Sequence, residues 1–374
     1  MRTLVPLAVL SLSILAACSE PEPVGLPVLG AGTHDATRVL IDVIASADEG
    51  LSTPTDVSVN PNQPGQLWVT NYDLNAITIL SGADFTDART PTSGGANHFL
   101  VDPMSLAFSD DGTFATIHDT DELTQGGATP ADFMGPVLWD DSDRFDGGHG
   151  GHLDMLHNSP LGGGIAWEAD NVYWVVDGYY GSLTRYDFNN DHGYGGANHS
   201  DHETARYVEG EIARTEGIPS HADFDRSSDL LFVADSDNGR IAVLDATSGT
   251  PGDRIGPNYD GGQQYAMEGA DLSTLVDGDL VEVVLTEKGE PTIRAVRLNQ
   301  PAGLELGGGL LYVTDHATSN ILAFDLEGQL VDWLPTGRPA DSLGGIEVLA
   351  DGSLVVTDLR ADELIRIRPL PEEE

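Results

Sequence analysis

The sequence of 374 residues is poor in cysteine and in positive charge. It contains one cysteine, and 17 lysines and arginines stand against 61 aspartates and glutamates, for a formal net charge of −44. A single thiol excludes an internal disulfide framework. The negative charge repels nucleic acid and anionic lipid headgroups, so we expect neither as a direct partner. The simplest explanation for the acidic surface is solubility.

Common catalytic motifs are also missing. The sequence has no GxSxG elbow of a serine hydrolase, no phosphate-binding P-loop, and no GxGxxG between a strand and a helix. After the N-terminal leader, no stretch keeps the apolar period of an amphipathic helix. We therefore expect an all-β chain, and no catalytic residue can be assigned from a motif.

The N-terminus has the layout of a signal peptide. Arg2 precedes an uncharged apolar run from Leu4 to Ala17, which is short for a membrane-spanning helix. The end of the leader, LAAC with Cys18 last, resembles the lipobox of bacterial lipoproteins. The resemblance implies cleavage before Cys18, diacylation of its thiol and acylation of the new amino terminus, with palmitate among the chains. The alternative is an ordinary secretory signal in which the cysteine is incidental.

The lipobox resemblance also implies where the mature chain lies and how the sequence is divided. Several acyl chains make membrane attachment long-lived, so we expect a monomer in the cell envelope that meets the membrane through its lipid only. Ser19, in place of Asp after the cysteine, favours the outer membrane and periplasm. We divide the chain into a signal peptide (1–17), a lipidated N-terminus and flexible tether (18–37), a repeat region (38–370) and an acidic tail (371–374).

One sequence unit recurs six times along the chain. Each copy has a Pro or Gly turn, an apolar strand, a polar turn, a second apolar strand that ends near an Asp, and a third strand. The copies begin at Pro54, Pro103, Gly162, Pro219, Pro301 and Gly344. Their second strands end at Asn71, His118, Asp177, Asp235, Asp315 and Asp358. Such small sheets cannot bury their faces alone, so the repeats predict a six-bladed β-propeller.

The clearest copies, LLFVADSDNGRIAVLD and LLYVTDHATSNILAFD, resemble NHL repeats. The likeness runs from about residue 50 to 370 and implies an NHL-type propeller. The copy at His118 departs from the pattern, which has Asp at that place. We expect the strand from Arg38 to Ser46 to pair with the last blade, because closing the ring removes an open sheet edge.

Two stretches are longer than the repeat requires. They run from Asp119 to Leu156 and from Gly252 to Pro291, and both are rich in Gly and Asp. We expect both to project from the ring as loops, where binding usually resides. A degenerate seventh blade is the alternative for the second stretch.

Seven of the eleven histidines fall in one part of the sequence. They are His149, His152, His157, His192, His199, His202 and His221. Histidines among acidic residues suit Zn²⁺, Cu²⁺ or Fe²⁺, which imidazole nitrogen ligates. We take His152, His157, His221, His192 and His199 as candidate metal ligands. His152 and His157 cannot both point the same way on an ideal strand, although a loop can bring them together. The alternative is a set of polar surface histidines.

His221 is the sharpest single candidate. Aligned first strands place it level with Asp56, Ser105, Gly164, Gly303 and Gly345. Innermost strands line the channel of a propeller, so we expect His221 to project into it where the glycines leave room for a ligand. The string IPSHADFD resembles one histidine strand of the peptidyl-hydroxyglycine amidating lyases, whose channel histidines hold zinc, and this carries over to His221 alone. HLDMLHNSP and DGYYGSLTRYDF are more similar to a group of uncharacterised bacterial NHL proteins.

Other side chains near the histidines can bind a ligand. An arginine can bind a carboxylate or a sugar acid, and a structural role is the alternative. The candidates are Tyr179, Arg185, Arg206 and His316.

Calcium has a weaker motif. Asp187 to Asp191 resembles the start of a calcium loop, but Gly193 falls one place late and Asn198 stands where Glu is required. The run Asp140, Asp141, Asp143 and Asp146 is more typical of a solvated loop.

Two classes of function remain open. The first is a recognition platform that presents the two long stretches to an envelope protein, peptide or glycan. The second is a metal-dependent lyase or hydrolase at the channel mouth, in which His152, His157 and His221 hold a metal that activates water.

Overall fold

The structure, a computed structural model, describes residues 25–90, 99–121, 134–142, 145, 152–256, 258–285 and 291–371, without the side chains of 281–295. Cys18 and the leader lie outside these residues, as do His149, Asp143 and Asp146. Within them no helix is long and apolar enough to cross a membrane.

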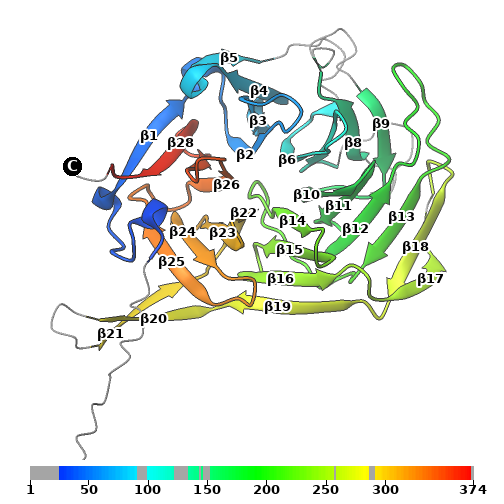
Figure 1. The fold of residues 1–374 in the computed structure, drawn as a ribbon. Helices are drawn as coiled ribbons and strands as arrows, with labels where there is room; N and C mark the ends of the chain where they lie inside the picture. The colour runs from blue at the N-terminus through cyan, green and yellow to red at the C-terminus, as the bar shows by residue number, and fades with distance from the viewer. Residues whose placement is uncertain are drawn as a thin grey trace, which may run out of the picture.

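Six β-sheets stand around a common axis as the blades of a propeller (Figure 1). Blade 1 comprises β2 (Pro54–Val59), β3 (Leu67–Asn71), β4 (Ala76–Ser81) and β5 (Asp87–Arg89). Blade 2 comprises β6 (Pro103–Phe108), β7 (Thr113–His118), β8 (Met134–Asp140) and β9 (His152–His157). The first strand of each blade is innermost, and the later strands lie progressively further out.

A hairpin inserted in the sequence of blade 4 adds to the sheet of blade 3. Blade 3 comprises β10 (Gly162–Ala169), β11 (Val172–Asp177), β12 (Ser182–Asp187) and β13 (Glu203–Tyr207), extended by β18 (Gln263–Glu268) and β17 (Thr250–Arg254). Blade 4 comprises β14 (Ala222–Asp225), β15 (Leu230–Asp235), β16 (Arg240–Asp245) and β19 (Asp271–Asp277). The β17–β18 hairpin therefore leaves blade 4 and pairs in parallel with β13 of blade 3.

The last two blades complete the ring. Blade 5 comprises β22 (Pro301–Gly307), β23 (Leu310–Asp315), β24 (Asn320–Phe324) and β25 (Leu330–Pro335). Blade 6 comprises β26 (Leu343–Val348), β27 (Leu354–Asp358), β28 (Glu363–Pro369) and β1 (Val39–Ala45). β1 pairs antiparallel with β28, with Ile41 opposite Ile367, so the predicted closure by the N-terminal strand is confirmed.

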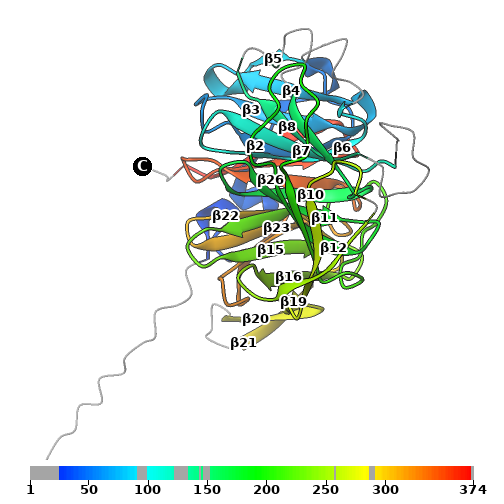
Figure 2. The ribbon, with the colours of Figure 1, turned by 90° about the vertical axis from the view of Figure 1, so that its right-hand side faces the viewer.

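Short 3-10 helices and one hairpin account for the remaining elements. The helices are η1 (Pro27–Leu29), η2 (Ala36–Arg38), η3 (Ala47–Glu49), η4 (Tyr72–Leu74) and η5 (Ala83–Phe85). The hairpin of β20 (Asp279–Leu285) and β21 (Pro291–Arg297) forms its own two-stranded sheet at the periphery (Figures 1 and 2).

The core lies between neighbouring blades. Trp68 of blade 1 packs among Phe114 and Trp139 of blade 2, and all three side chains are fully buried. Burying an aromatic side chain of this size stabilises the fold by roughly 2–3 kcal/mol. Each blade therefore depends on the next, as expected for units that cannot bury their faces alone.

The second strands of all six repeats end at the predicted residues. At three of them an Asp accepts backbone N–H groups of the following turn; Asp177, for example, accepts from Tyr179 and Tyr180. Asp235 instead accepts the N–H of Ala213, which precedes blade 4. His118 takes this place in blade 2, where burial lowers its pKa to about 3 and its Nε2 lies 3.0 Å from Thr116 Oγ1. A neutral imidazole thus replaces the usual carboxylate.

The two long stretches contain strands, so the prediction that they are loops was wrong for much of their length. The first supplies β8 and β9 of blade 2, and the second supplies β17, β18, β19 and β20. In the second stretch β17, β18 and β19 lie on the outside of their blades and are mostly exposed or half-buried, so their apolar pattern is weak. In the first stretch β8 and β9 are mostly buried. Among the described residues no seventh blade forms.

The N-terminal segment docks on the ring before β1 begins. The backbone N–H groups of Leu26 and Gly32 donate to Asp332 Oδ2, at 2.6 and 3.1 Å. The His34 ring stacks on Trp333 with centroids 4.5 Å apart. The part of the expected tether that the structure describes therefore packs against blades 5 and 6.

Candidate metal and ligand sites

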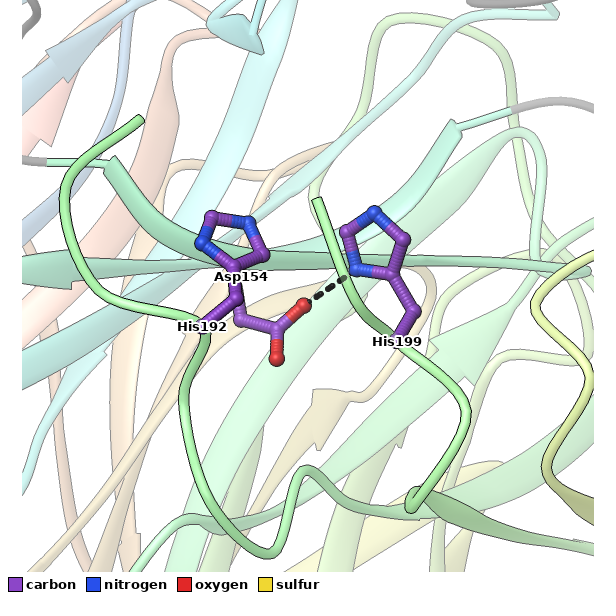
Figure 3. A group of neighbouring side chains, drawn as sticks. All are labelled: Asp154, His192 and His199. Carbon is purple, nitrogen blue, oxygen red and sulfur yellow. Dashed lines mark hydrogen bonds and ion pairs between the residues drawn. The ribbon is translucent and has the colours of Figure 1, made fainter. Parts of the chain in front are cut away.

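A segment of blade 3 brings two histidines against blade 2. It connects β12 to β13 and carries His192 and His199 over β9, where Asp154 is buried. One ligand atom from each of these three residues lies within 4.8 Å of the others (Figure 3). Among the described residues this is the group whose spacing can hold a metal ion.

The ring of His192 is held in an orientation that suits a ligand. Its Nδ1 lies 2.6 Å from the carbonyl oxygen of Gly193, so Nδ1 carries the hydrogen and donates it. Its Nε2 is buried and has no hydrogen-bond partner. A neutral imidazole with a free Nε2 is the form that binds metals, and a backbone carbonyl on the other nitrogen is the usual second partner.

Asp154 and His199 form the second half of the group. The His199 Nδ1 lies 2.6 Å from Asp154 Oδ1, and the carboxylate is almost completely buried. Burial raises the pKa of Asp154 against the opposing hydrogen bond from His199. Burial alone would lower the pKa of His199, but the Asp154 carboxylate outweighs it and the net shift is upward. The pair therefore retains a proton that a metal ion would displace.

His152 lies beside this group. Its ring centroid is 4.9 Å from that of His192, and its other face stacks on Phe99 at 4.3 Å. On a strand, residues two apart share a face, so His152 and Asp154 of β9 both face the segment that carries His192. The structure thus brings together three of the five predicted histidines, His152, His192 and His199.

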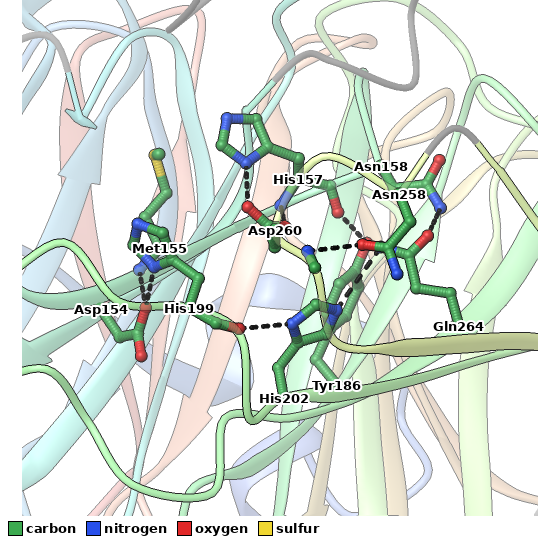
Figure 4. A network of polar contacts seen from close by, with 11 residues as sticks. Asp154, Met155, His157, Asn158, Tyr186, His199, His202, Asn258, Asp260 and Gln264 are labelled. Atoms are coloured by element: carbon green, nitrogen blue, oxygen red, sulfur yellow. Dashed lines mark hydrogen bonds and ion pairs between the residues drawn. The ribbon is translucent and has the colours of Figure 1, made fainter.

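His157 belongs to a separate polar network. Its Nδ1 lies 2.7 Å from Asp260 Oδ1 and its backbone N–H donates to Asp260 Oδ2, both buried (Figure 4). The Tyr186 hydroxyl donates to the carbonyl of His157, and Asn158 donates to Gln264. This network ties the β17–β18 insertion to blade 2 and leaves His157 outside the metal group.

His221 lies in the central channel, as predicted, immediately before β14. Its Nδ1 is 3.4 Å from Asp56 Oδ1, and with Ser105 these residues line a small cavity of about 40 Å³. The expectation that glycines leave room here was wrong. A Cβ on Gly164 would stand 2.2 Å from Ser220 O, and one on Gly303 would stand 2.3 Å from Gly344 O. These glycines allow neighbouring inner strands to approach closely.

The other ligand-binding candidates contact groups of the chain itself. Arg185 makes a two-point ion pair with Glu168, both contacts at 2.7 Å. Arg206 is buried, donates to the carbonyl of Asn158 and lies 3.5 Å above the Tyr180 ring. His316 Nδ1 lies 2.8 Å from the carbonyl of Leu343. Tyr179 is half exposed and packs edge-on against Tyr180. These contacts support a structural role for the four residues, which was the alternative to ligand binding.

The calcium-like segment has turn geometry instead of an ion cage. Asp187 accepts the backbone N–H of Asn189, and Asp191 accepts that of Gly193. Asn189 and Asn190 both contact Asp201. The aspartate carboxylates accept, and the asparagine amides donate, hydrogen bonds that shape the segment carrying His192 and His199.

Two acidic residues of these sites were not predicted from the sequence. Asp154 lies two residues after His152 in HLDMLH. Side chains two apart on a strand share a face, so this spacing is the signal that could have identified Asp154. Asp260 carries no such signal, because it reaches His157 only through the unusual parallel pairing of β13 with β18.

No protein-family model and no curated protein matches the sequence. Solved structures with a similar fold include a Bacteroides thetaiotaomicron protein of unknown function, with a TM-score of 0.57, 12% identity and coverage of 88% of this chain and 75% of that one. An auxiliary nutrient binding protein from Bacteroides ovatus has a TM-score of 0.54, 11% identity and coverage of 90% and 77%. For a virginiamycin B lyase from Staphylococcus aureus the values are 0.50, 13%, 89% and 100%.

These similarities show that the chain has the β-propeller fold. At such identities they carry no information about a ligand or a reaction. The NHL type of the repeats stays a prediction.

Proposed function

We propose that this chain is a binding propeller of the bacterial cell envelope that holds a divalent transition metal at Asp154, His192 and His199. The observation that carries the proposal is the convergence of these three groups, with the Nε2 of His192 buried and unpaired. Three protein ligands leave one position of a tetrahedral Zn²⁺ open. Through that position the metal would take a donor atom from an envelope protein, peptide or glycan.

The choice of metal follows from the ligand atoms. Two imidazole nitrogens and one carboxylate suit Zn²⁺, Cu²⁺ or Fe²⁺. Calcium has less support, because it prefers sets of six to eight oxygen ligands.

A metal-dependent lyase or hydrolase at the channel mouth has less support than binding. That alternative needs His152, His157 and His221 around one ion. His157 is engaged by Asp260, and His221 faces Asp56 in the channel. Within the described part of the chain, these histidines do not form a group with metal-ligand spacing.

Metal analysis tests the proposal directly. The full chain is loaded with Zn²⁺, dialysed, and its metal content measured by mass spectrometry. We expect one zinc per chain, lost in His192→Ala and in His199→Ala and retained in His221→Asn. Absence of bound metal in the parent chain would overturn the proposal. Loss in His221→Asn with retention in His192→Ala would move the site to the channel and favour the lyase alternative.

The envelope location rests on the LAAC sequence and receives its own test. Similar folds include auxiliary nutrient-binding proteins of Bacteroides, which is compatible with such a location. We expect the chain in the membrane fraction, labelled by radioactive palmitate, and expect Cys18→Ser to abolish both. An unlabelled, soluble parent chain would contradict the anchor and leave the metal site unaffected.

A further inference from the structure

The axial channel widens into a cavity at one end of the ring. The cavity measures about 390 Å³ and is lined at the ends of the inner strands β2, β6, β10, β14 and β22 and by Glu347 of β26. It adjoins the smaller cavity of His221, since Ser58, Leu106 and Glu305 line both. A volume of this size is within the range that holds a small organic molecule.

The opposite end of the channel is crossed by the chain between β13 and β14. Ala213 donates to Asp235 of blade 4, and Arg214 forms an ion pair with Asp119, which directly follows β7 of blade 2. Gln300, just before blade 5, donates to Thr215 at 3.0 Å. A segment that contacts blades 2, 4 and 5 at one end of the ring must pass over its axis. A ligand would therefore enter through the 390 Å³ end.

One layer of the channel has an uneven composition. Residues two places beyond the aligned position of His221 face the channel at the same level, because side chains alternate along a strand. This residue is acidic in three blades: Asp223 in blade 4, Glu305 in blade 5 and Glu347 in blade 6. In the other three it is small: Ser58 in blade 1, Ala107 in blade 2 and Ala166 in blade 3. All six line the 390 Å³ cavity. Three acidic residues thus face three small ones, and the small ones leave the space open.

Two of the three carboxylates in this layer are held by the next blade. Asp223 Oδ2 accepts the backbone N–H of Leu306 at 2.9 Å, and Glu347 Oε2 accepts that of Val59 at 2.9 Å. Glu305 lies between them, and no described residue donates a hydrogen bond to its carboxylate. Burial and the carboxylates of Glu347, Asp223 and also Asp56 raise the pKa of Glu305 well above its ordinary value, so a positive charge beside Glu305 is needed to favour its ionised form.

The lining holds one positive charge against the three carboxylates. Arg226 is the one cationic side chain that lines the cavity among the described residues. Its guanidinium lies 4.2 Å above the Trp167 ring and 3.8 Å from Asp110. Both contacts hold it on the side of blades 2 and 3, whereas the three acidic residues belong to blades 4 to 6.

No set of three channel carboxylates among the described residues has ligand atoms within 4.8 Å of one another. A metal ion would also fill little of a cavity of about 390 Å³, whereas a small organic molecule fits it. Phe108 and Phe224 also line the cavity, but their side chains are buried in the cores between blades, and the Trp167 ring is covered by Arg226. Three acidic side chains against one cationic side chain favour a positively charged ligand.

We propose that the 390 Å³ cavity binds a small organic cation, a protonated amine or a quaternary ammonium group, with Glu305 as its counter-ion. The cation lies between the acidic half of the layer and the small residues opposite. This site is separate from the metal group of blades 2 and 3 and does not depend on it.

Calorimetric titration of the full chain tests the site. The probes are cadaverine and tetramethylammonium, with 1-pentanol as an uncharged comparison, at physiological salt to screen the surface charge. We expect the two cations to bind and 1-pentanol to be at least tenfold weaker. Glu305→Gln should lower cation affinity at least tenfold, while Glu327→Gln, the same charge change on the exposed surface, should leave it unchanged.

A second variant acts through volume alone. Ala107→Leu fills the small side of the layer without a change of charge and should also abolish binding of the cations. Thermal unfolding of each variant shows that it is folded. Absence of binding by both cations, equal loss in Glu327→Gln, equal affinity for 1-pentanol, or binding retained in Ala107→Leu would each overturn the proposal. So would displacement of the probes by stoichiometric Mg²⁺, because the site would then be a metal site.

Discussion

The two candidate sites of this propeller are built in opposite ways. The axial cavity is made of equivalent positions in the six repeats, and its chemistry comes from which side chain each blade places there. The metal group is made of an outer strand of one blade and a connecting segment of the next, at positions the repeat does not share. In a repeat scaffold, equivalent positions of the repeats form the channel. A site with its own set of side chains forms where a segment departs from the repeat.

The largest expected effect concerns the asymmetric site. Asp154→Asn removes the one negatively charged ligand of the metal group, and a direct ligand should matter more than outer partners, which contribute 10–100-fold. We expect zinc affinity to fall by at least about 100-fold, or about 2.7 kcal/mol. Competition with a chromogenic chelator measures it.

The matched control for this change is Asp191→Asn. It makes the same charge change in the segment that carries His192, at a carboxylate that accepts only the N–H of Gly193 in the described structure. Zinc affinity should stay within a few-fold of the parent chain. Equal losses in the two variants would mean that general negative charge, and not the geometry of Asp154, attracts the metal.

The difference between the sites also explains what the sequence could predict. Aligning the repeats placed His221 and Asp56 at one channel level, and the structure puts them 3.4 Å apart. The same alignment could not show that Gly164 faces the neighbouring strand, because it contains no information on the distance between blades. Asp154 joins His192 only after the segment between β12 and β13 folds across a blade boundary. No local pattern encodes that contact.

The second prediction tests the symmetric layer. Burial raises the pKa of Glu347 from 4.5 to about 7. Folding then favours the protonated form, so its stabilising contribution is present below pH 4.5 and is lost as the pH rises through 7. We expect the parent chain to lose about 2 kcal/mol between pH 5 and pH 7 relative to Glu347→Gln. Urea unfolding at the two pH values measures the difference.

Glu347→Gln is a suitable comparison because its amide oxygen can still accept the N–H of Val59. The titratable groups near Glu347 are Asp56, Asp223 and Glu305, and they remain in both proteins. The same pH dependence in the variant and the parent would assign it to these neighbours. The cation probe should reduce the loss at pH 7, because a bound positive charge stabilises the ionised carboxylate.

The smallest predicted effect has the opposite sign and concerns the one repeat that departs from the pattern. Burial holds the pKa of His118 at about 3, against an ordinary value of 6.5. Its neutral ring stabilises the fold above pH 6.5, and this contribution is lost as the pH falls toward 3, because the unfolded chain binds the proton first. We expect a loss of about 1.5 kcal/mol at pH 5.5 relative to pH 8. His118→Asn, which copies Asn71 of blade 1, should remove this acid-side slope while the alkaline slope from Glu347 persists. An unchanged slope in His118→Asn would mean that the ring is protonated in the fold, and that a buried positive charge stands where the other blades place Asp or Asn.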